Sequence, residues 1–327
     1  MNKESKYFTT GIVYDERYLD HRTGNHPECA ERLTAIYQYL KEKGILKETK
    51  EIEPYLAPLE VVEYIHSKPY IESIKKLSEM GGDMLDMDTA VSPQTYEVAL
   101  LAVGGVLAAI DAIMARTIKK ALCLVRPPGH HSMPERGKGF CIFNNIAIGA
   151  RYIQKKHDLK RVAIIDWDVH HGNGTQAAFY DDPTVFYLSI HQFPHYPGTG
   201  SENEVGINEG KGYTMNAPLT AGADITTYKK VFEERFLPTM KSFKPDFILI
   251  SSGFDAHRDD PLAGINLLEE DYGLLTRMIG ALAEEICNGR IVSILEGGYN
   301  LNALKLSTYE HLCGLMEIEG RREKREQ

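Results

Sequence analysis

Residues 164–176 read IIDWDVHHGNGTQ, an apolar run that passes directly into two aspartates, two histidines and two glycines. The run RVAII at 161–165 has the length and the β-branched content of a buried strand. In open parallel sheets, sites form beyond the carboxyl ends of the strands. We therefore expect 161–165 to be a strand of such a sheet, with the polar residues that follow it at the site.

Short apolar runs alternate with helical patterns along the rest of the chain. Continuous apolar runs of this kind predict parallel strands that are covered on both faces. The expected fold is a single-domain α/β fold with a mainly parallel central sheet flanked by helices on both faces. Strands are expected at 121–125, 161–165, 184–190, 213–218, 246–252 and 290–295, and helices at 28–43, 57–80 (two short helices), 93–117, 144–156, 224–240, 269–288 and 301–318.

No repeat, linker or change of composition divides the chain. We expect one domain over residues 1–318, followed by the charged tail EGRREKREQ at 319–327. The N-terminus lacks the apolar segment of a secretory signal, and no apolar run approaches the roughly 18 residues of a membrane span. The five cysteines stand singly, which is typical of a reducing compartment. The expected location is the cytoplasm.

The charge balance narrows the classes of partner. The net charge is −9 and the pI is near 5.8, which disfavours a nucleic-acid binder with a basic face. An acidic protein suits cationic substrates, such as a chain that bears lysine. We expect neither nucleic acid nor a membrane as a partner, and the sequence leaves an oligomer open.

Chemically reactive side chains follow five of the predicted strands. Because the carboxyl ends of parallel strands meet at one edge of a sheet, these residues are expected to form one site. The segments are RPPGHH (126–131), DWDVHHGNG (166–174), a pair of histidines at 191 and 195, GFDAH (253–257) and EGGY (296–299).

Three of these residues have the spacing and chemistry of metal ligands. Asp166, Asp168 and His170 are two apart, so in an extended chain they would share one face and converge. Asp255 comes just after the predicted strand at 246–252, and it completes a set of Asp168, His170 and Asp255. Three protein ligands leave a fourth position for water, as a catalytic zinc requires. The alternative is a capping or salt-bridging Asp-x-His pair, which is common at strand ends.

Three further residues suit acid–base and oxyanion chemistry. His131 could take a proton from an activated water and return it to a leaving amine. Each imidazole needs a partner on its other nitrogen, and Asp166 suits His130 while Asn173 suits His131. Tyr299 follows two glycines and could donate its hydroxyl to a developing oxyanion. The alternatives are polar loop histidines and a buried core tyrosine.

Together these motifs resemble the histone deacetylase family, which shares the arginase-type α/β fold. The sequence around Asn173, DWDVHHGNGTQ, resembles that of the class II branch and of the bacterial histone deacetylase-like amidohydrolases. The resemblance implies a zinc-dependent amidohydrolase that removes acetyl or other acyl groups from the lysine ε-amine of proteins or peptides. The matching stretches, in family order, are HPECAERL (26–33), RPPGHH (126–131), GFCIFNN (139–145), DWDVHHGNGTQ (166–176), YPGTG (196–200), GFDAH (253–257) and EGGY (296–299).

The resemblance also implies a role for each matching residue. Asp168, His170 and Asp255 match the ligands of Zn²⁺, with Fe²⁺ as the alternative ion. His130, His131, Asp166, Asn173 and Tyr299 match the catalytic groups. The acyl-lysine channel matches Gly139, Phe140, Tyr196 and Leu262, although the family more commonly has phenylalanine where Tyr196 stands. A site for K⁺ or Na⁺ matches Asp166, Asp168, His170, Ser189 and Ile190, and a looser second site lies near Phe179, Asp182, Val185 and Tyr213.

Three other functions remain open from the sequence. An acetylpolyamine amidohydrolase would use the same catalytic residues, and an acidic rim residue such as Asp86 or Asp88 would suit either substrate. An arginase-like enzyme with two manganese ions would need acids where Asn173 and His257 stand. A metal-bearing binding module would lack the base or the tyrosine. The expected partner is therefore an acyl-lysine protein or peptide, or an acetylated amine.

Overall fold

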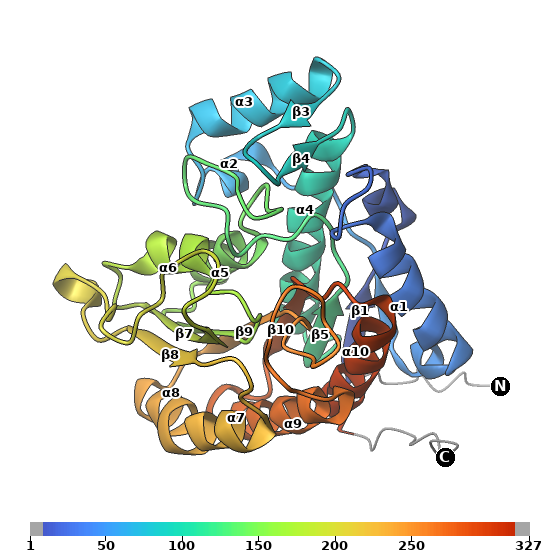
Figure 1. Ribbon diagram of the computed structural model, residues 1–327. Coiled ribbons are helices and arrows are strands. Elements are labelled where there is room, and N and C mark those ends of the chain that lie inside the picture. Colours follow the sequence, from blue (N-terminus) through green and yellow to red (C-terminus); the bar gives the residue numbers. More distant parts are fainter. Residues whose placement is uncertain (1–8, 318–327) are drawn as a thin grey trace.

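The computed structural model, which describes residues 9–317, has a central sheet with helices on both faces (Figure 1). The strand order is β2-β1-β5-β10-β9-β6-β7-β8, and every neighbouring pair is parallel. The predicted fold is thus confirmed. The strands are β1 Thr10–Val13, β2 Lys50–Ile52, β5 Lys120–Cys123, β6 Val162–Asp166, β7 Val185–Gln192, β8 Thr214–Leu219, β9 Phe247–Ser252 and β10 Ile291–Leu295.

The central strands are buried along their whole length, as their continuous apolar runs predict. Every residue of β5, β6, β9 and β10 is buried. Two strands at one side of the sheet, β1 and β2, were not predicted. Both are short, and Gly11 in β1 leaves room for Ile52 and Ile118, which pack where a Cβ would stand. A separate antiparallel pair, β3 (Asp83–Met84) with β4 (Ala90–Val91), was not predicted either.

The helices form layers on the two faces of the sheet (Figure 1). Helices α4 and α5 pack against strands on one face, and α9 and α10 pack together and against β9 and β5 on the other. The predicted helix at 224–240 is divided by a π-helical turn, Phe232–Phe236, and the last helix ends at Leu315 rather than 318. The charged tail at 319–327 lies outside the described residues. The helices are α1 Ala30–Glu42, α2 Leu59–Val62, α3 Lys68–Glu79, α4 Thr95–Met114, α5 Asn145–His157, α6 Asn173–Phe179, α7 Ile225–Val231, α8 Leu237–Phe243, α9 Glu269–Cys287 and α10 Leu301–Leu315.

Helix α4 corrects the expectation that no apolar segment approaches the length of a membrane span. Its 20 residues have a mean hydropathy of 2.0, so length and composition alone would allow it to cross a bilayer. In the structure, however, 72% of the apolar window is buried. The helix packs against β1, β5 and α5, and its apolar character on all sides is that of a core helix.

The sheet order brings the five chemically reactive loops together. Strands β5, β10, β9, β6 and β7 are consecutive neighbours in the sheet, although they are not consecutive in the chain. Asp166 at the end of β6 pairs in register with Ser189 of β7 and Ser251 of β9. The carboxyl ends of these strands are therefore level, and the loops that follow them share one edge, as predicted.

Candidate functional site

Asp168, His170 and Asp255 form a compact buried group at this edge. Asp168 and His170 follow β6, and Asp255 follows β9. One potential ligand atom from each lies within 4.8 Å of the others. His170 Nδ1 is 3.1 Å from Asp168 Oδ1 and 3.1 Å from Asp255 Oδ2. Two carboxylates and one imidazole that converge in this way form a donor set that fits a single divalent cation.

Asp166 does not join this group, so the expectation that three alternating residues converge was wrong. Strand β6 ends at Asp166, and the chain is no longer extended beyond it, so the two-residue alternation stops. Instead, Asp166 Oδ2 accepts a hydrogen bond from the Tyr187 hydroxyl (3.0 Å) and lies 3.1 Å from His130 Nδ1. The predicted partnership of Asp166 with His130 is thus present.

Backbone groups of neighbouring loops orient the carboxylates. Gly297 N donates to Asp168 Oδ2 (2.8 Å), and Val169 N donates to Asp255 Oδ1 (2.9 Å). A Cβ on residue 297 would stand 2.1 Å from Asp255 Oδ2, so only glycine fits there. Gly298 has φ of +117°, which a side chain would disfavour. The two glycines of EGGY therefore let the loop after β10 close on the metal-ligand group.

The electrostatics of the group favour a bound positive charge. Burial lowers the pKa of His170, but hydrogen bonds and charge interactions with Asp168 and Asp255 outweigh burial and raise the pKa to about 10. Burial and the neighbouring Asp168 raise the pKa of Asp255. Buried carboxylates this close together need a cation, and a divalent ion would supply more charge than the imidazolium proton does.

His131 has the hydrogen bonding of a general base. Its Nδ1 is 2.8 Å from Asn173 Oδ1, an oxygen that can only accept, so Nδ1 carries the hydrogen and Nε2 keeps its lone pair. Burial lowers the pKa of His131 well below its usual value, and His130 and His170 lower it further. The imidazole is therefore neutral and able to accept a proton.

His130 has the opposite electrostatic environment. Burial lowers its pKa, but Asp168, Asp166 and Glu296 together raise the pKa to about 10. The rings of His130 and His131 lie 4.0 Å apart, so a charged His130 helps to keep its neighbour neutral. The two adjacent histidines thus differ in protonation because carboxylates surround His130, whereas burial and neighbouring imidazoles lower the pKa of His131.

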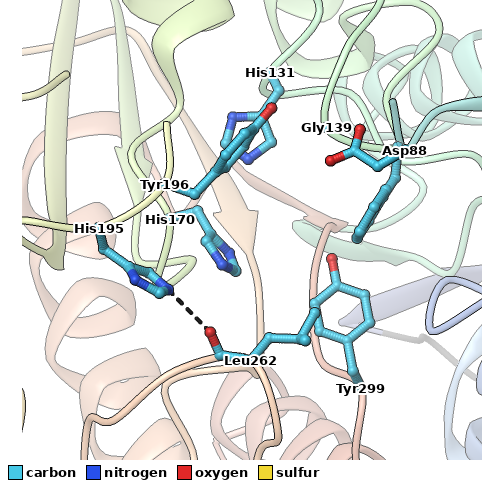
Figure 2. Close-up of a pocket in the computed structure, with 9 residues that line it drawn as sticks. Asp88, His131, Gly139, His170, His195, Tyr196, Leu262 and Tyr299 are labelled. Atoms are coloured by element: carbon cyan, nitrogen blue, oxygen red, sulfur yellow. Dashed lines mark hydrogen bonds between the residues drawn. The ribbon is translucent and has the colours of Figure 1, made fainter. Parts of the chain in front are cut away.

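A pocket opens above the metal-ligand group, and Figure 2 shows the side chains around it. All four predicted channel residues line it, together with the proposed base and the tyrosine. Phe140 meets the Tyr299 ring edge-on at 5.7 Å, and Tyr196 meets His131 edge-on at 5.1 Å. The lining residues are Asp88, His131, Gly139, Phe140, His170, His195, Tyr196, Leu262 and Tyr299.

Two further residues of this region, His195 and Glu296, had no predicted role. His195 stacks on His170 with ring centroids 5.2 Å apart, and its Nε2 hydrogen-bonds to the carbonyl oxygen of Leu262 (2.9 Å). Glu296 Oε2 accepts hydrogen bonds from Gly129 N (2.7 Å) and from the next backbone N–H. The signals available were a histidine directly before YPGTG and an acid at the start of EGGY. Asp88, suggested as a rim residue, does line the pocket.

The predicted sites for monovalent cations stay predictions. Ser189 is buried beside Asp166 in the sheet, and its Oγ lies 2.8 Å from His191 Nδ1. In the looser second site, the Asp182 carboxylate accepts a hydrogen bond from Thr184 N (2.7 Å) and pairs with Arg151.

The arrangement does not favour a two-manganese, arginase-like site. Asn173 is engaged with His131, and His257 Nε2 lies 3.3 Å from a carboxylate oxygen of Glu269. Among residues 9–317, Asp168, His170 and Asp255 form a cluster that could hold a metal ion. The base and the tyrosine that a non-enzymatic module would lack are both in place at the pocket.

Known proteins are similar to this chain over most of its length. Residues 26–315 match the histone deacetylase domain. A probable deacetylase of Archaeoglobus fulgidus is 42% identical over 295 residues, covering 89% of this chain and 82% of the relative. The histone deacetylase-like amidohydrolase of Pseudomonas aeruginosa is 40% identical over 258 residues, covering 78% and 66%.

A solved structure has the same fold as this chain. The crystal structure of the HDA15 HD domain superposes with a TM-score of 0.90 at 35% sequence identity, covering 95% of this chain and 90% of that one. Histone deacetylase 14 of Arabidopsis thaliana, named as chloroplastic, is 38% identical and covers 91% of this chain and 74% of the relative. With the domain match and the fold in agreement, the chain belongs to the histone deacetylase family of hydrolases.

Proposed function

We propose that this protein is a zinc-dependent amidohydrolase that removes acetyl or other acyl groups from the lysine ε-amine of proteins or peptides. One observation carries the proposal: the buried Asp168, His170 and Asp255 group lies at the base of a pocket that also holds His131 and Tyr299. The names of the relatives, a probable deacetylase and a histone deacetylase-like amidohydrolase, support the same reaction.

The residues divide the reaction among themselves. A divalent zinc-class ion, when bound, supplies a Lewis acid that lowers the pKa of water and polarises a carbonyl oxygen. His131 Nε2 takes the proton of the attacking water, whose oxygen forms the new bond to the acyl carbon. Tyr299 donates its hydroxyl to the oxyanion. His131 then returns the proton to the amine as the C–N bond breaks, which gives a carboxylate and free lysine.

The remaining predicted residues support this chemistry. We propose that the pocket walls formed by Gly139, Phe140, Tyr196 and Leu262 hold the alkyl stem of the substrate. His130 stays charged beside Asp166 and contributes positive charge to the site. We propose that a K⁺ or Na⁺ ion binds through Asp166, Asp168, His170, Ser189 and Ile190. This ion would stabilise the negative charge of the Asp166 carboxylate beside His130.

Substitution of Tyr299 by phenylalanine tests the oxyanion role. Turnover of an acetyl-lysine peptide should fall about 10²–10³-fold, because one oxyanion donor is lost. The content of divalent metal, measured by mass spectrometry, should not change, because the hydroxyl is not a proposed ligand. Tyr37→Phe removes a hydroxyl from α1, outside the pocket, and serves as the control. Turnover close to that of the wild type in Tyr299→Phe would refute the assignment.

An acetylated polyamine remains the second candidate substrate. The Asp88 carboxylate lines the pocket and would attract a cationic amine as well as a peptide. A panel of acetyl-lysine peptides, longer acyl-lysine peptides and acetylated polyamines separates the two functions by kcat/KM. A clear preference for the polyamines would replace the proposed protein or peptide substrate.

We further propose that residues 1–318 form one catalytic domain. The match to the family over 26–315 supports a single catalytic unit. The cytoplasmic location stays a prediction, since two of the relatives are named as chloroplastic.

A further inference from the structure

Asp260 is a buried carboxylate for which the proposed reaction has no use. Asp260 is only 6% exposed, yet no cationic side chain forms an ion pair with its carboxylate among the described contacts. Instead it accepts three backbone hydrogen bonds. Oδ2 takes one from Tyr299 N (2.7 Å) and one from Asn300 N (3.3 Å), and Oδ1 takes one from Leu262 N (3.0 Å).

These bonds connect different walls of the pocket. Tyr299 belongs to the loop after β10, whereas Leu262 belongs to the loop after β9. The Leu262 carbonyl continues the connection, because it accepts a hydrogen bond from His195 on the loop after β7 (Figure 2). Asp260 therefore links the backbone of Tyr299, the proposed oxyanion donor, to Leu262. Through the Leu262 carbonyl the connection continues to His195 on the loop after β7.

Only a carboxylate can satisfy this arrangement. Both oxygens of Asp260 face backbone N–H donors, so replacing either oxygen by an amide NH₂ would set a donor against a donor. The Tyr299 ring is held separately, by the edge of Phe140 and by the Arg32 guanidinium 5.1 Å from its centroid. The ring contacts restrict rotation of the side chain, while Asp260 holds the backbone from which that side chain projects.

We propose that Asp260 is a positioning residue that fixes the Tyr299 backbone relative to Leu262 and so sets where the Tyr299 hydroxyl meets the acyl carbonyl. The inference rests on the proposed function, because it assumes that Tyr299 donates to the oxyanion. Asp260 itself does not line the pocket. Its effect is exerted through Tyr299 and should disappear when the hydroxyl is absent.

The first test is a double-mutant cycle on an acetyl-lysine peptide. Asp260→Asn should lower kcat by about 10–10²-fold, as a small displacement of a catalytic group does, with a smaller change in KM. In the Tyr299→Phe background the same substitution should change kcat by less than about twofold, because the two residues act as one unit. Asp259→Asn, an exposed neighbour of the same type, is the matched control and should keep wild-type kcat.

The second test does not depend on activity. Hydrogen exchange of a peptide covering 298–303 should be faster in Asp260→Asn, because the amides of Tyr299 and Asn300 lose their acceptor. A peptide covering β10 should exchange at the wild-type rate. If Asp260→Asn does not fold, Asp260→Glu keeps the charge but moves it by one methylene, and it should show the same kinetic cycle.

Three results would overturn the inference: unchanged kcat in both Asp260 variants, an equal loss with and without the Tyr299 hydroxyl, or loss of the bound divalent ion from Asp260→Asn. A wild-type rate in Tyr299→Phe alone would instead refute the role proposed for Tyr299, so the two failures can be told apart.

Discussion

At the scale of single residues, burial and the nearby charges set the protonation of His130 and His131. His131 faces the Asn173 amide, whereas His130 faces the Asp166 carboxylate, and only the pKa of His130 is raised. Because a base must be neutral to accept a proton, the lowered pKa of His131 would keep this proposed base active far into the acidic range. The acidic limb of the pH–rate profile should therefore report the pKa of His131, and a charged side chain at position 173 should move it.

Replacement of Asn173 by aspartate tests this dependence. A carboxylate beside His131 Nδ1 favours the imidazolium, so the pKa of His131 should rise and the acidic limb of kcat/KM should move to higher pH. The profile is measured from about pH 5 to 9 with an acetyl-lysine peptide. Asn302→Asp adds the same charge on the exposed start of α10 and is the control. An unchanged acidic limb would contradict the assignment of His131 as the base.

The sequence predicts the residues whose side chains do chemistry and misses those that act through backbone contacts. The proposed ligands Asp168, His170 and Asp255 could be found because metal ligands have characteristic types and spacing. Asp260 could not be found, and neither could the role of Glu296 within EGGY, because both depend on the backbone N–H groups that fold against these carboxylates. Those contacts depend on how separate loops meet, which the order of residues along one segment does not reveal.

At the scale of elements, a buried ion cluster joins the start of α1 to two loops of the candidate site, those after β5 and β10. Glu28 accepts from Arg126 Nε at 2.5 Å and Nη2 at 2.8 Å. Arg32 pairs with Glu28 and donates to the backbone carbonyls of Glu296 and Gly298. The motif HPECAERL, which carried part of the family resemblance, therefore has a physical role, because it ties α1 to the loops after β5 and β10.

Glu28→Gln should destabilise the fold by about 3–5 kcal/mol, because Arg126 and Arg32 would stay buried without their carboxylate. Burial alone would raise the pKa of Glu28, but Arg126 outweighs burial and holds it at about 2. Since this pKa is below the ordinary 4.5, the stabilisation is complete above pH 4.5 and is lost as pH falls toward 2.

Urea unfolding between about pH 2.5 and 7 measures that prediction. The wild type should lose stability below pH 4.5 more steeply than Glu28→Gln, because the variant lacks the titrating group. Glu42→Gln, at the exposed end of α1, is the control and should follow the wild type. Parallel curves for the wild type and Glu28→Gln would show that the cluster does not contribute in this way.

At the scale of the whole molecule, the burial and the length of the strands explain which part of the sheet was predictable. The central strands were predicted, whereas β1 and β2 at one side of the sheet were not. Central strands such as β6 and β9 are covered on both faces, so their sequences are continuous apolar runs. Strands β1 and β2 are short, and β2 is partly exposed, so neither produces such a run. The site was predictable in turn because it lies where the well-predicted central strands end.

The whole fold should also be stabilised by the divalent ion, and more so at high pH. Without the ion, the raised pKa of His170 means that its imidazolium offsets the charges of Asp168 and Asp255. A group whose pKa is raised from 6.5 to about 10 gives its full stabilisation below pH 6.5 and loses it as pH rises toward 10. The bound ion carries a charge that does not titrate away over this range, and its ligands bind more tightly once deprotonated.

The difference in Tm between the metal-loaded and the chelated protein should therefore widen as pH rises from about 6.5 to 9. Differential scanning calorimetry, with zinc added back after the chelator is removed, measures this difference. At a free zinc concentration of 100 times Kd, the recovered stability should be about 2.7 kcal/mol. Asp255→Ala removes one proposed ligand, so its Tm should respond far less to chelator or zinc. Two results would mean that the three residues do not hold the ion. One is a Tm that stays the same after verified metal removal, and the other is a Tm difference between loaded and chelated protein that narrows as pH rises.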